Sequence, residues 1–273
     1  MKRAFVIIII LLGGVGVLSY PTLSNYFAQK NGSTTIREYE KEVAAYDSEA
    51  LDAMWAEAER YNESLAGQPV HDPFIENTGM AMPEDYGRVL DLNGVMGNVE
   101  IPKIDVNLPI YHGTNEGVLK KGVGHLEGST LPIGGISRHS VLTGHSGLTH
   151  AKLFTDLTEL KKGDLFFVHV LGRTLAYEVD QIKVVEPHVT GDLVRVSGKD
   201  YCTLLTCTPY GINTHRLLVR GERVEYVPAI RDAIVPIQES SVNDMVFHAV
   251  VITSAIMLAA IIIALIRTRR KHE

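Results

Sequence analysis

Residues 203–211 read TLLTCTPYG, an apolar stretch that ends on a cysteine and is followed by proline and glycine. Proline cannot donate to a β-ladder and glycine interrupts regular structure, so we expect a strand that ends at Cys207. A side chain at such a place is held rigidly and is accessible from the neighbouring loop. The stretch therefore makes Cys207 a candidate nucleophile, although a cysteine at a strand end is more often a small core residue.

The second of the two cysteines, Cys202, lies near the start of the same expected strand. Five residues of strand span roughly 16 Å at about 3.3 Å per residue, whereas a disulfide requires Cα atoms within about 7 Å. The odd spacing also points the two side chains to opposite faces of the strand. We therefore predict two free thiols and assign Cys202 to packing.

Cysteine catalysis also needs a group that moves a proton and a group that stabilises an oxyanion. His145 follows the apolar run 140–143 and stands among glycines that allow close approach of another group. Arg216 begins a further apolar run, and a hairpin would place it across from Cys207. The ordinary alternatives are a structural histidine and a solvent-exposed edge arginine, and His125 is the main rival among the histidines.

The surrounding sequence predicts a mainly β domain over residues 88–227. Short runs rich in branched and aromatic residues alternate there with Gly, Pro, Asn and Asp, which is typical of a barrel or sandwich. Residues 35–66 have apolar positions spaced by three or four and predict a helical segment that can break near Asp47. Residues 67–87, with three prolines, predict a long loop, and residues 228–244 predict a tether.

Both ends of the chain are apolar and carry basic residues on their outer side. Residues 4–20 and 245–266 therefore predict two transmembrane helices. Basic flanks favour the cytoplasm, so residues 1–3 and the basic tail 267–273 are expected inside and the intervening domain outside the cell. The N-terminal run lacks a clear cleavage site, which favours an uncleaved anchor over a signal peptide.

The composition argues against several other classes of function. The net charge is −6 with both signs mixed, whereas a nucleic-acid partner requires a clustered basic face. The sequence also lacks CxxC, HExxH and EF-hand patterns. We therefore expect no nucleic-acid partner, no metal site and no cofactor.

Taken together, these segments resemble the sortase family. The sequence TLLTC at 203–207 matches the family's TLxTC motif, and Arg216 stands a few residues beyond it, as the family's arginine does. Residues 143–145 (TGH) match the histidine segment, and the three elements follow the family order. The resemblance covers roughly residues 25–226 and implies a closed β-barrel of about eight strands with helices on its flank.

Further features resemble the class C, or pilin, sortases, which have a second C-terminal span and an N-terminal lid with an Asp-Pro-Phe or Asp-Pro-Trp motif. Residues 71–74 read HDPF and lie inside the long loop. By this resemblance, Asp72 would pair with Arg216, and Phe74 would cover Cys207 and His145. On its own, an Asp-Pro-Phe sequence is more often an ordinary turn.

The resemblance also implies a reaction. The Cys207 thiolate would cut an LPxTG-type sorting signal between Thr and Gly and form a thioester, which a pilin lysine amine would resolve to give a polymer. His145 as imidazolium would protonate the leaving amine, and Arg216 would stabilise the oxyanion. Thr206 and Thr208 are expected to support the oxyanion or the substrate, the latter through a nearby backbone N–H.

Three alternatives remain at this point. A housekeeping-type sortase would share the catalytic residues but use a cell-wall precursor amine as acceptor. A non-catalytic membrane adaptor would bind extended peptides without reacting with them. An unrelated extracellular cysteine transpeptidase is the third alternative.

Overall fold

The chain, seen here in a computed structural model, divides into two compact units. The smaller unit comprises Met1–Gln29, Thr149–Ala151 and Ile237–Glu273, and the larger comprises Lys30–Leu148 and Lys152–Pro236. The residues that the structure describes are 2–65, 71–74, 85–234, 247–249, 251–257, 259, 262–263 and 266, without the side chains of 2–9, 11–12 and 15.

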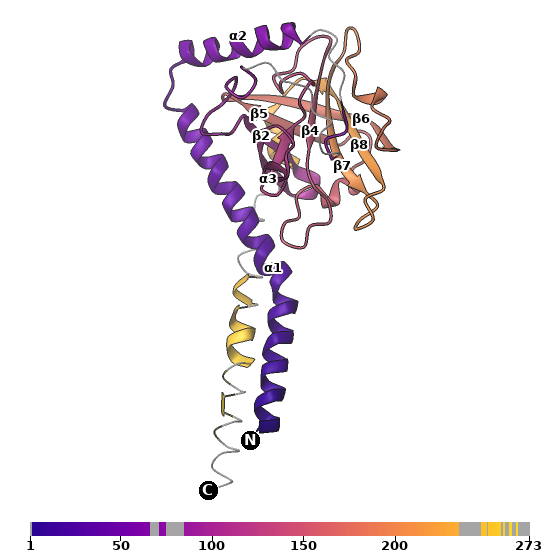
Figure 1. Cartoon of the computed structure of the whole chain (residues 1–273). Coiled ribbons are helices and arrows are strands. Elements are labelled where there is room, and N and C mark those ends of the chain that lie inside the picture. Colours follow the sequence, from indigo (N-terminus) through magenta and orange to yellow (C-terminus); the bar gives the residue numbers. More distant parts are fainter. Residues whose placement is uncertain are drawn as a thin grey trace. The chain divides into compact units, whose positions relative to one another are not determined.

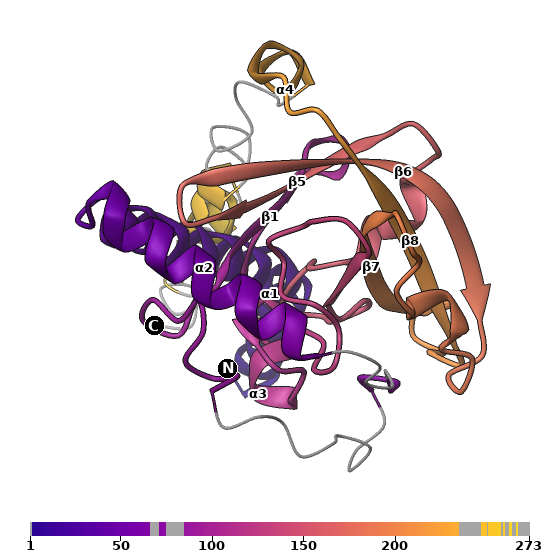
Figure 2. The same ribbon diagram turned by 90° about the horizontal axis from the view of Figure 1, so that it is seen from above.

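Eight strands of the larger unit form a closed barrel (Figures 1 and 2). The strands are β1 (Gly97–Ile101), β2 (Val106–His112), β3 (Val123–His125), β4 (Arg138–Thr143), β5 (Leu165–Val170), β6 (Arg173–Val185), β7 (Asp200–Thr208) and β8 (His215–Val224). The helices are α1 (Lys2–Val43), α2 (Ser48–Ser64), α3 (Glu116–Leu119) and α4 (Pro228–Ile234). The barrel order is β1-β2-β3-β4-β7-β8-β6-β5, with β5 paired to β1. The expected mainly β fold, a barrel of about eight strands with N-terminal helices, is confirmed.

The strand that carries TLLTC is β7, which lies in the barrel between two different partners. It runs parallel to β4 and antiparallel to β8. It ends at Thr208, immediately before Pro209 and one residue beyond the end predicted from the sequence. Cys202 is fully buried and both cysteines are free thiols, which confirms that they form no disulfide with each other.

The expected helical segment 35–66 corresponds to the end of α1 and the whole of α2. The helix breaks where Asp47 caps α2, because the aspartate side chain accepts a hydrogen bond from a backbone N–H of the first turn. Tyr39, buried on α1, donates to the carbonyl oxygen of Met96 (3.0 Å) and accepts from the N–H of Leu171 (2.9 Å). One buried hydroxyl thus ties this helix to two places on the barrel.

The expected lid, residues 67–87, is described at 71–74 and 85–87, and the rest of it lies outside the described residues. Its two flanks are held on the barrel. Asn62 on α2 exchanges two hydrogen bonds with the backbone of the β3–β4 connection. The buried Tyr86 hydroxyl donates to the carbonyl oxygen at the end of β3.

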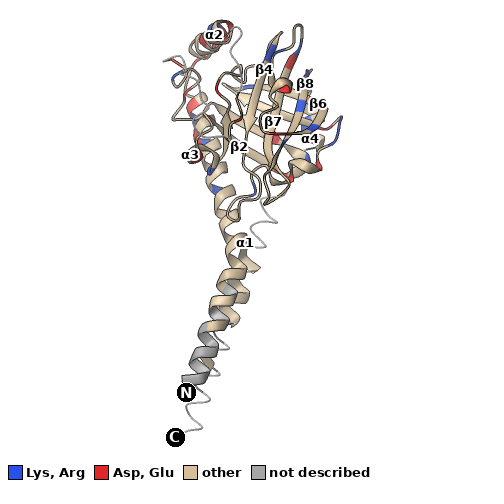
Figure 3. Ribbon diagram, turned by 45° about the vertical axis from the view of Figure 1, so that its right-hand side comes forward, with Lys and Arg blue, Asp and Glu red and all other residues tan. Residues whose placement is uncertain are grey.

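The two predicted membrane segments, residues 4–20 and 245–266, fall partly on residues or side chains that the structure does not describe. No helix in the described part of the chain combines the length and the hydropathy that crossing a bilayer requires. Charged residues of both signs are spread over α2 and the barrel, whereas residues 10–29 of α1 carry none (Figure 3). The expected tether begins with α4, a short helix.

The lowered pKa values of two buried histidines allow us to predict how the stability of the barrel depends on pH. Burial lowers the pKa of His125 and of His139 to about 4, against about 6.5 in an unfolded chain. The unfolded chain therefore binds more protons between these values, so the free energy of unfolding is expected to fall as the pH drops from about 6.5 towards 4. The full loss is on the order of 3 kcal/mol per histidine.

Urea unfolding at several pH values measures this effect. The His139→Gln variant should be less stable at pH 7, yet its stability should change less with pH between about 6.5 and 4. His188→Gln serves as a matched control because His188 is exposed. An unchanged pH dependence in His139→Gln would contradict the assignment of His139 as a buried neutral group.

Candidate active site

Cys207 on β7 lies directly opposite Arg216 on β8 in the antiparallel register. Side chains at such paired positions share a face of the sheet, with Cβ atoms about 4.5–5.5 Å apart. Cys207 is 8% exposed and Arg216 is 7% exposed. The hairpin inferred from the sequence is therefore present, and it brings the thiol and the guanidinium to one place.

His145 follows β4, the parallel neighbour of the strand that carries Cys207. The N–H of Gly144 donates to the β7 backbone (3.1 Å), and the Thr206 hydroxyl donates to the Gly144 carbonyl oxygen (2.7 Å). Residue 144 has to be glycine, because a Cβ there would lie 2.8 Å from the ring of Phe154. These contacts hold His145 at the same end of the sheet as Cys207.

The two threonines predicted to support the oxyanion or substrate differ in position. Thr206 is buried and its hydroxyl is engaged with the histidine segment, so it holds β4 and β7 together at the site. Thr208 is the last residue of β7 and is half-buried beside Cys207. The Ser146 hydroxyl, which the sequence did not single out, donates to the Cys207 carbonyl oxygen (2.6 Å).

His125, the rival histidine, is a structural residue. It is fully buried on β3, and both of its ring nitrogens have protein partners. Nδ1 lies 2.9 Å from the Tyr86 hydroxyl, and Nε2 lies 2.9 Å from the Thr130 carbonyl oxygen. Neither nitrogen is free to exchange a proton with a substrate, which leaves His145 as the candidate.

Asp72 and Arg216 form a buried ion pair, as the resemblance implied. Arg216 Nε donates to Asp72 Oδ1 (3.1 Å), and a terminal nitrogen of the guanidinium lies 2.9 Å from Oδ2. The other terminal nitrogen donates to the carbonyl oxygens of Asn213 and His215. The guanidinium is thus occupied on every side by residues of this chain.

Phe74 lies over the same site. Its ring centroid is 5.5 Å from that of His145, and the Arg216 guanidinium carbon lies 5.0 Å from the ring centroid. The Asp72 carboxylate accepts from the Phe74 N–H (3.0 Å), which fixes the short turn that presents the ring. The ring also packs against an apolar cluster formed by Leu126, Val141, Leu193, Leu205 and Leu218.

The covered site keeps the cysteine protonated at neutral pH. Burial raises the pKa of the Cys207 thiol to about 11, Arg216 opposes this rise, and Asp72 adds to it. Since only a thiolate is a strong nucleophile, the arrangement is a closed resting form.

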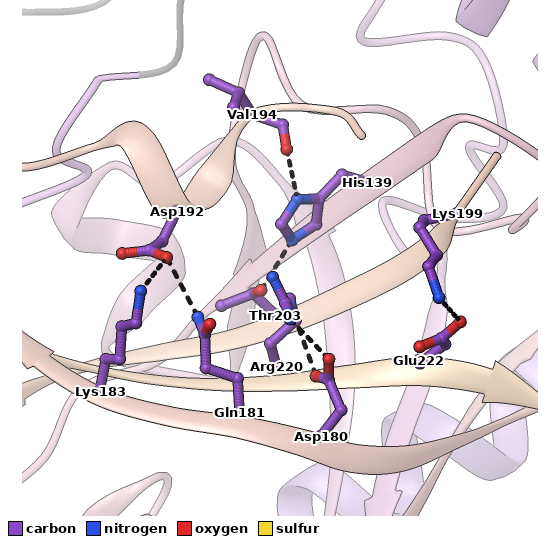
Figure 4. A network of polar contacts seen from close by, with 10 residues as sticks. All are labelled: His139, Asp180, Gln181, Lys183, Asp192, Val194, Lys199, Thr203, Arg220 and Glu222. Atoms are coloured by element: carbon purple, nitrogen blue, oxygen red, sulfur yellow. Dashed lines mark hydrogen bonds and ion pairs between the residues drawn. The ribbon is translucent and has the colours of Figure 1, made fainter. Parts of the chain in front are cut away.

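A network of polar contacts holds the connection between β6 and β7 to the neighbouring strands (Figure 4). The buried His139 ring holds it from β4, because Nδ1 lies 3.0 Å from the Val194 carbonyl oxygen. Asp192 accepts from Lys183 on β6 (2.6 Å), and Lys199 pairs with Glu222 on β8 (2.6 Å). These anchors hold the connection in place while its Leu193 side chain enters the apolar cluster under Phe74.

The described residues hold no group of three or more His, Cys, Asp or Glu side chains that could bind a metal ion. The side chains gathered at the site are a thiol, an imidazole and a guanidinium. This set performs acyl transfer through a covalent intermediate.

Comparison with known proteins also indicates an enzyme that transfers acyl groups through a cysteine. Residues 99–224 match the sortase domain family. The chain is 52% identical to sortase C-1 of Streptococcus pneumoniae, with a TM-score of 0.67, over 71% of this chain and 100% of that one. It is 46% identical to a pilus-related sortase C of Group B Streptococcus, with a TM-score of 0.65, over 70% and 97% of the two chains. It is 26% identical to sortase A of Bacillus anthracis over 82% of this chain and 96% of that protein.

Proposed function

The chain belongs to the sortase family and is a cysteine transpeptidase of the pilus-associated class C, and from this we propose that it joins pilin subunits. It cleaves an LPxTG-type sorting signal between Thr and Gly and carries the acyl group as a thioester on Cys207. The observation that carries this proposal is the pairing of Cys207 with Arg216 beside the anchored His145, all beneath Asp72 and Phe74.

In the first half-reaction, the Cys207 sulfur forms a bond to the Thr carbonyl carbon, whose oxygen becomes negatively charged. Arg216, once released from Asp72, stabilises this oxyanion together with a backbone N–H near Thr208. The bond from that carbon to the Gly nitrogen then breaks, and the His145 imidazolium gives its proton to the leaving amine. The product is a thioester and a neutral imidazole.

In the second half-reaction, a pilin lysine brings its ε-amine to the thioester. The neutral amine nitrogen bonds to the carbonyl carbon, His145 takes the proton that this nitrogen loses, and Cys207 leaves as thiolate. The imidazolium and thiolate are thereby restored, and the product is an isopeptide bond between two subunits. A housekeeping-type sortase would run the same steps with a cell-wall precursor amine.

The closed lid supports a regulated transferase over a non-catalytic adaptor. Arg216 cannot stabilise an oxyanion while Asp72 occupies its fork, and Cys207, which is 8% exposed, is not accessible to a peptide chain. An adaptor has no need for a thiol whose reactivity is controlled in this way. The pilin precursor, or a partner bound to it, is the natural trigger for opening.

The enzyme acts at the cell membrane, with the barrel outside and both termini in the cytoplasm. The support for this placement is the pair of apolar segments 4–20 and 245–266, each with a basic outer flank. An extracellular barrel meets the sorting signals of exported pilins. Protease treatment of intact cells should digest the barrel and leave tags on both termini protected.

One reaction tests the function directly. The full chain in detergent is incubated with an LPxTG-type peptide and a lysine-containing pilin peptide, and products are analysed by mass spectrometry. We expect an acyl adduct on Cys207 and an isopeptide-linked product, with Cys207→Ala as the blank. Cleavage without an adduct on Cys207 would contradict the mechanism, and preference for a wall-precursor amine over pilin lysine would point to the housekeeping reaction.

A further inference from the structure

We infer that Glu116 is a positioning residue for His145. Its carboxylate binds Nε2 of the imidazole and leaves Nδ1 to exchange protons with the substrate. The inference rests on the proposed function, because it concerns how the same histidine performs the two proton transfers. The sequence did not single out Glu116, which looks like an ordinary acidic residue in the first turn of a helix.

Glu116 is the first residue of α3, the short helix between β2 and β3. The Asn115 side chain caps this helix by accepting from the N–H of Val118 (3.1 Å), which fixes the start of the helix at which Glu116 stands. Oε2 of Glu116 lies 3.2 Å from Nε2 of His145, and Oε1 lies 3.2 Å from the Lys120 ammonium. Each oxygen thus has its own partner.

The other contacts of His145 are made by an apolar side chain or involve its backbone. Phe74 covers the ring, and the N–H of Phe154 holds the His145 carbonyl oxygen (3.0 Å). Within the described part of the chain, Glu116 provides the only hydrogen bond to the ring. The charged groups around it are Glu116, Lys120 behind Glu116, and Arg216 with Asp72 on the far side of Phe74.

The two ring nitrogens therefore have separate tasks. In the neutral imidazole, Nε2–H donates to the carboxylate, so the tautomer is fixed and the lone pair of Nδ1 is free to accept a proton from the attacking lysine amine. In the imidazolium, both nitrogens carry protons, the carboxylate stabilises the positive charge, and Nδ1 gives its proton to the leaving amine. The proton on Nε2 stays in place throughout the cycle.

The expected loss of kcat without Glu116 can be estimated from the exposure of the two side chains to solvent. The Glu116 side chain is 62% exposed and the His145 side chain is 17% exposed, and ion pairs in contact with water are weak and screened by salt. We therefore expect kcat to fall by about threefold to tenfold without Glu116, and the difference to shrink at high ionic strength. KM should stay within about twofold, since the carboxylate acts through His145 and does not bind the peptide.

The experiment compares Glu116→Ala, Glu116→Gln and Glu116→Asp in the full chain. An Asp72→Ala background keeps the lid from limiting the rate. The LPxTG-type peptide and the pilin lysine peptide give kcat and KM, and thermal unfolding checks the fold. Glu159→Gln is the matched control, because Glu159 is exposed and makes no ion pair among the described residues.

The expected result is a lower kcat for the Ala and Gln variants, a partial or full return with Asp, and no change for Glu159→Gln. Unchanged kcat in the Ala and Gln variants would overturn the inference. A raised KM at constant kcat would overturn it as well and would assign Glu116 to binding the incoming amine. If the parent protein formed no adduct on Cys207, the proposed function itself would fail, so the two failures are distinguishable.

Discussion

Replacing Arg216 with alanine is expected to lower kcat/KM by about 10²–10³-fold, the usual effect of removing one donor from an oxyanion site. The guanidinium stands directly opposite Cys207 in the β7–β8 register, so it lies where charge develops on the thioester-forming carbonyl. The same change should open the lid. Asp72 is buried and its carboxylate would lose its ion-pair partner, which is a strongly unfavourable arrangement.

The variant is thus expected to be more open and less active, a combination that a purely structural arginine would not produce. Peptide turnover gives the activity, and hydrogen exchange at residues 71–74 gives the opening. Arg223→Ala is a suitable control, because Arg223 lies on the same strand and pairs with Asp200 on β7. Arg216→Lys should keep part of the activity, since it retains the charge and loses the fork. Normal turnover in Arg216→Ala would remove the arginine from the mechanism.

The sequence was most informative where contacts are local. The end of the strand near Cys207 and the hairpin to Arg216 followed from a proline and from the few residues between the two positions. The break of the helix near Asp47 was likewise a local signal. His145 is different, because β4 and β7 pair in parallel and far apart in the chain. Its place came from the family resemblance, since no periodicity predicts which distant strands become neighbours.

The N-terminal helix shows that a proline in the sequence does not always mark the end of a helix. The sequence predicted separate segments at 4–20 and 35–66, whereas α1 runs from Lys2 to Val43 with Pro21 inside it. Extending an existing helix costs far less than starting one, so a single proline does not end it. The anchors of the β6–β7 connection and the Glu116–His145 contact were missed for another reason. Each joins residues from separate elements, and each side chain looks ordinary in its own stretch.

Opening the lid by Asp72→Ala or by Phe74→Ala is expected to speed thiol labelling of Cys207 at pH 7 on the order of 100-fold. The thiol pKa is about 11 in the closed form, against an ordinary value of 9.0, and burial and the Asp72 charge are the causes of the rise. Two pH units correspond to about a hundredfold difference in the thiolate fraction, and the thiolate is the species that reacts. Loss of the covering Phe74 ring also gives the labelling reagent better access to the thiol, which increases the rate further.

The pH dependence separates the chemical part of the effect from the steric part. In the unaltered protein, the labelling rate should keep rising with pH up to about 11, because the thiolate fraction grows until the pH passes the raised pKa. In the Asp72→Ala variant, Arg216 still lowers the pKa of the thiol while the carboxylate no longer raises it. The rate should therefore level off at a lower pH, and a steric gate alone would leave that midpoint where it is.

Cys202 is an internal control in the same measurement. It is fully buried in the barrel, and burial raises the pKa of its thiol far above the ordinary value, so it should stay unlabelled in every variant. Asp232→Ala is the matched control for charge, because Asp232 is an exposed carboxylate paired with the neighbouring Arg231. If neither lid variant labelled faster than the unaltered protein while Cys202 remained protected, residues 71–74 would not be what keeps Cys207 unreactive. The buried Asp72–Arg216 pair would then have to be explained by stability alone.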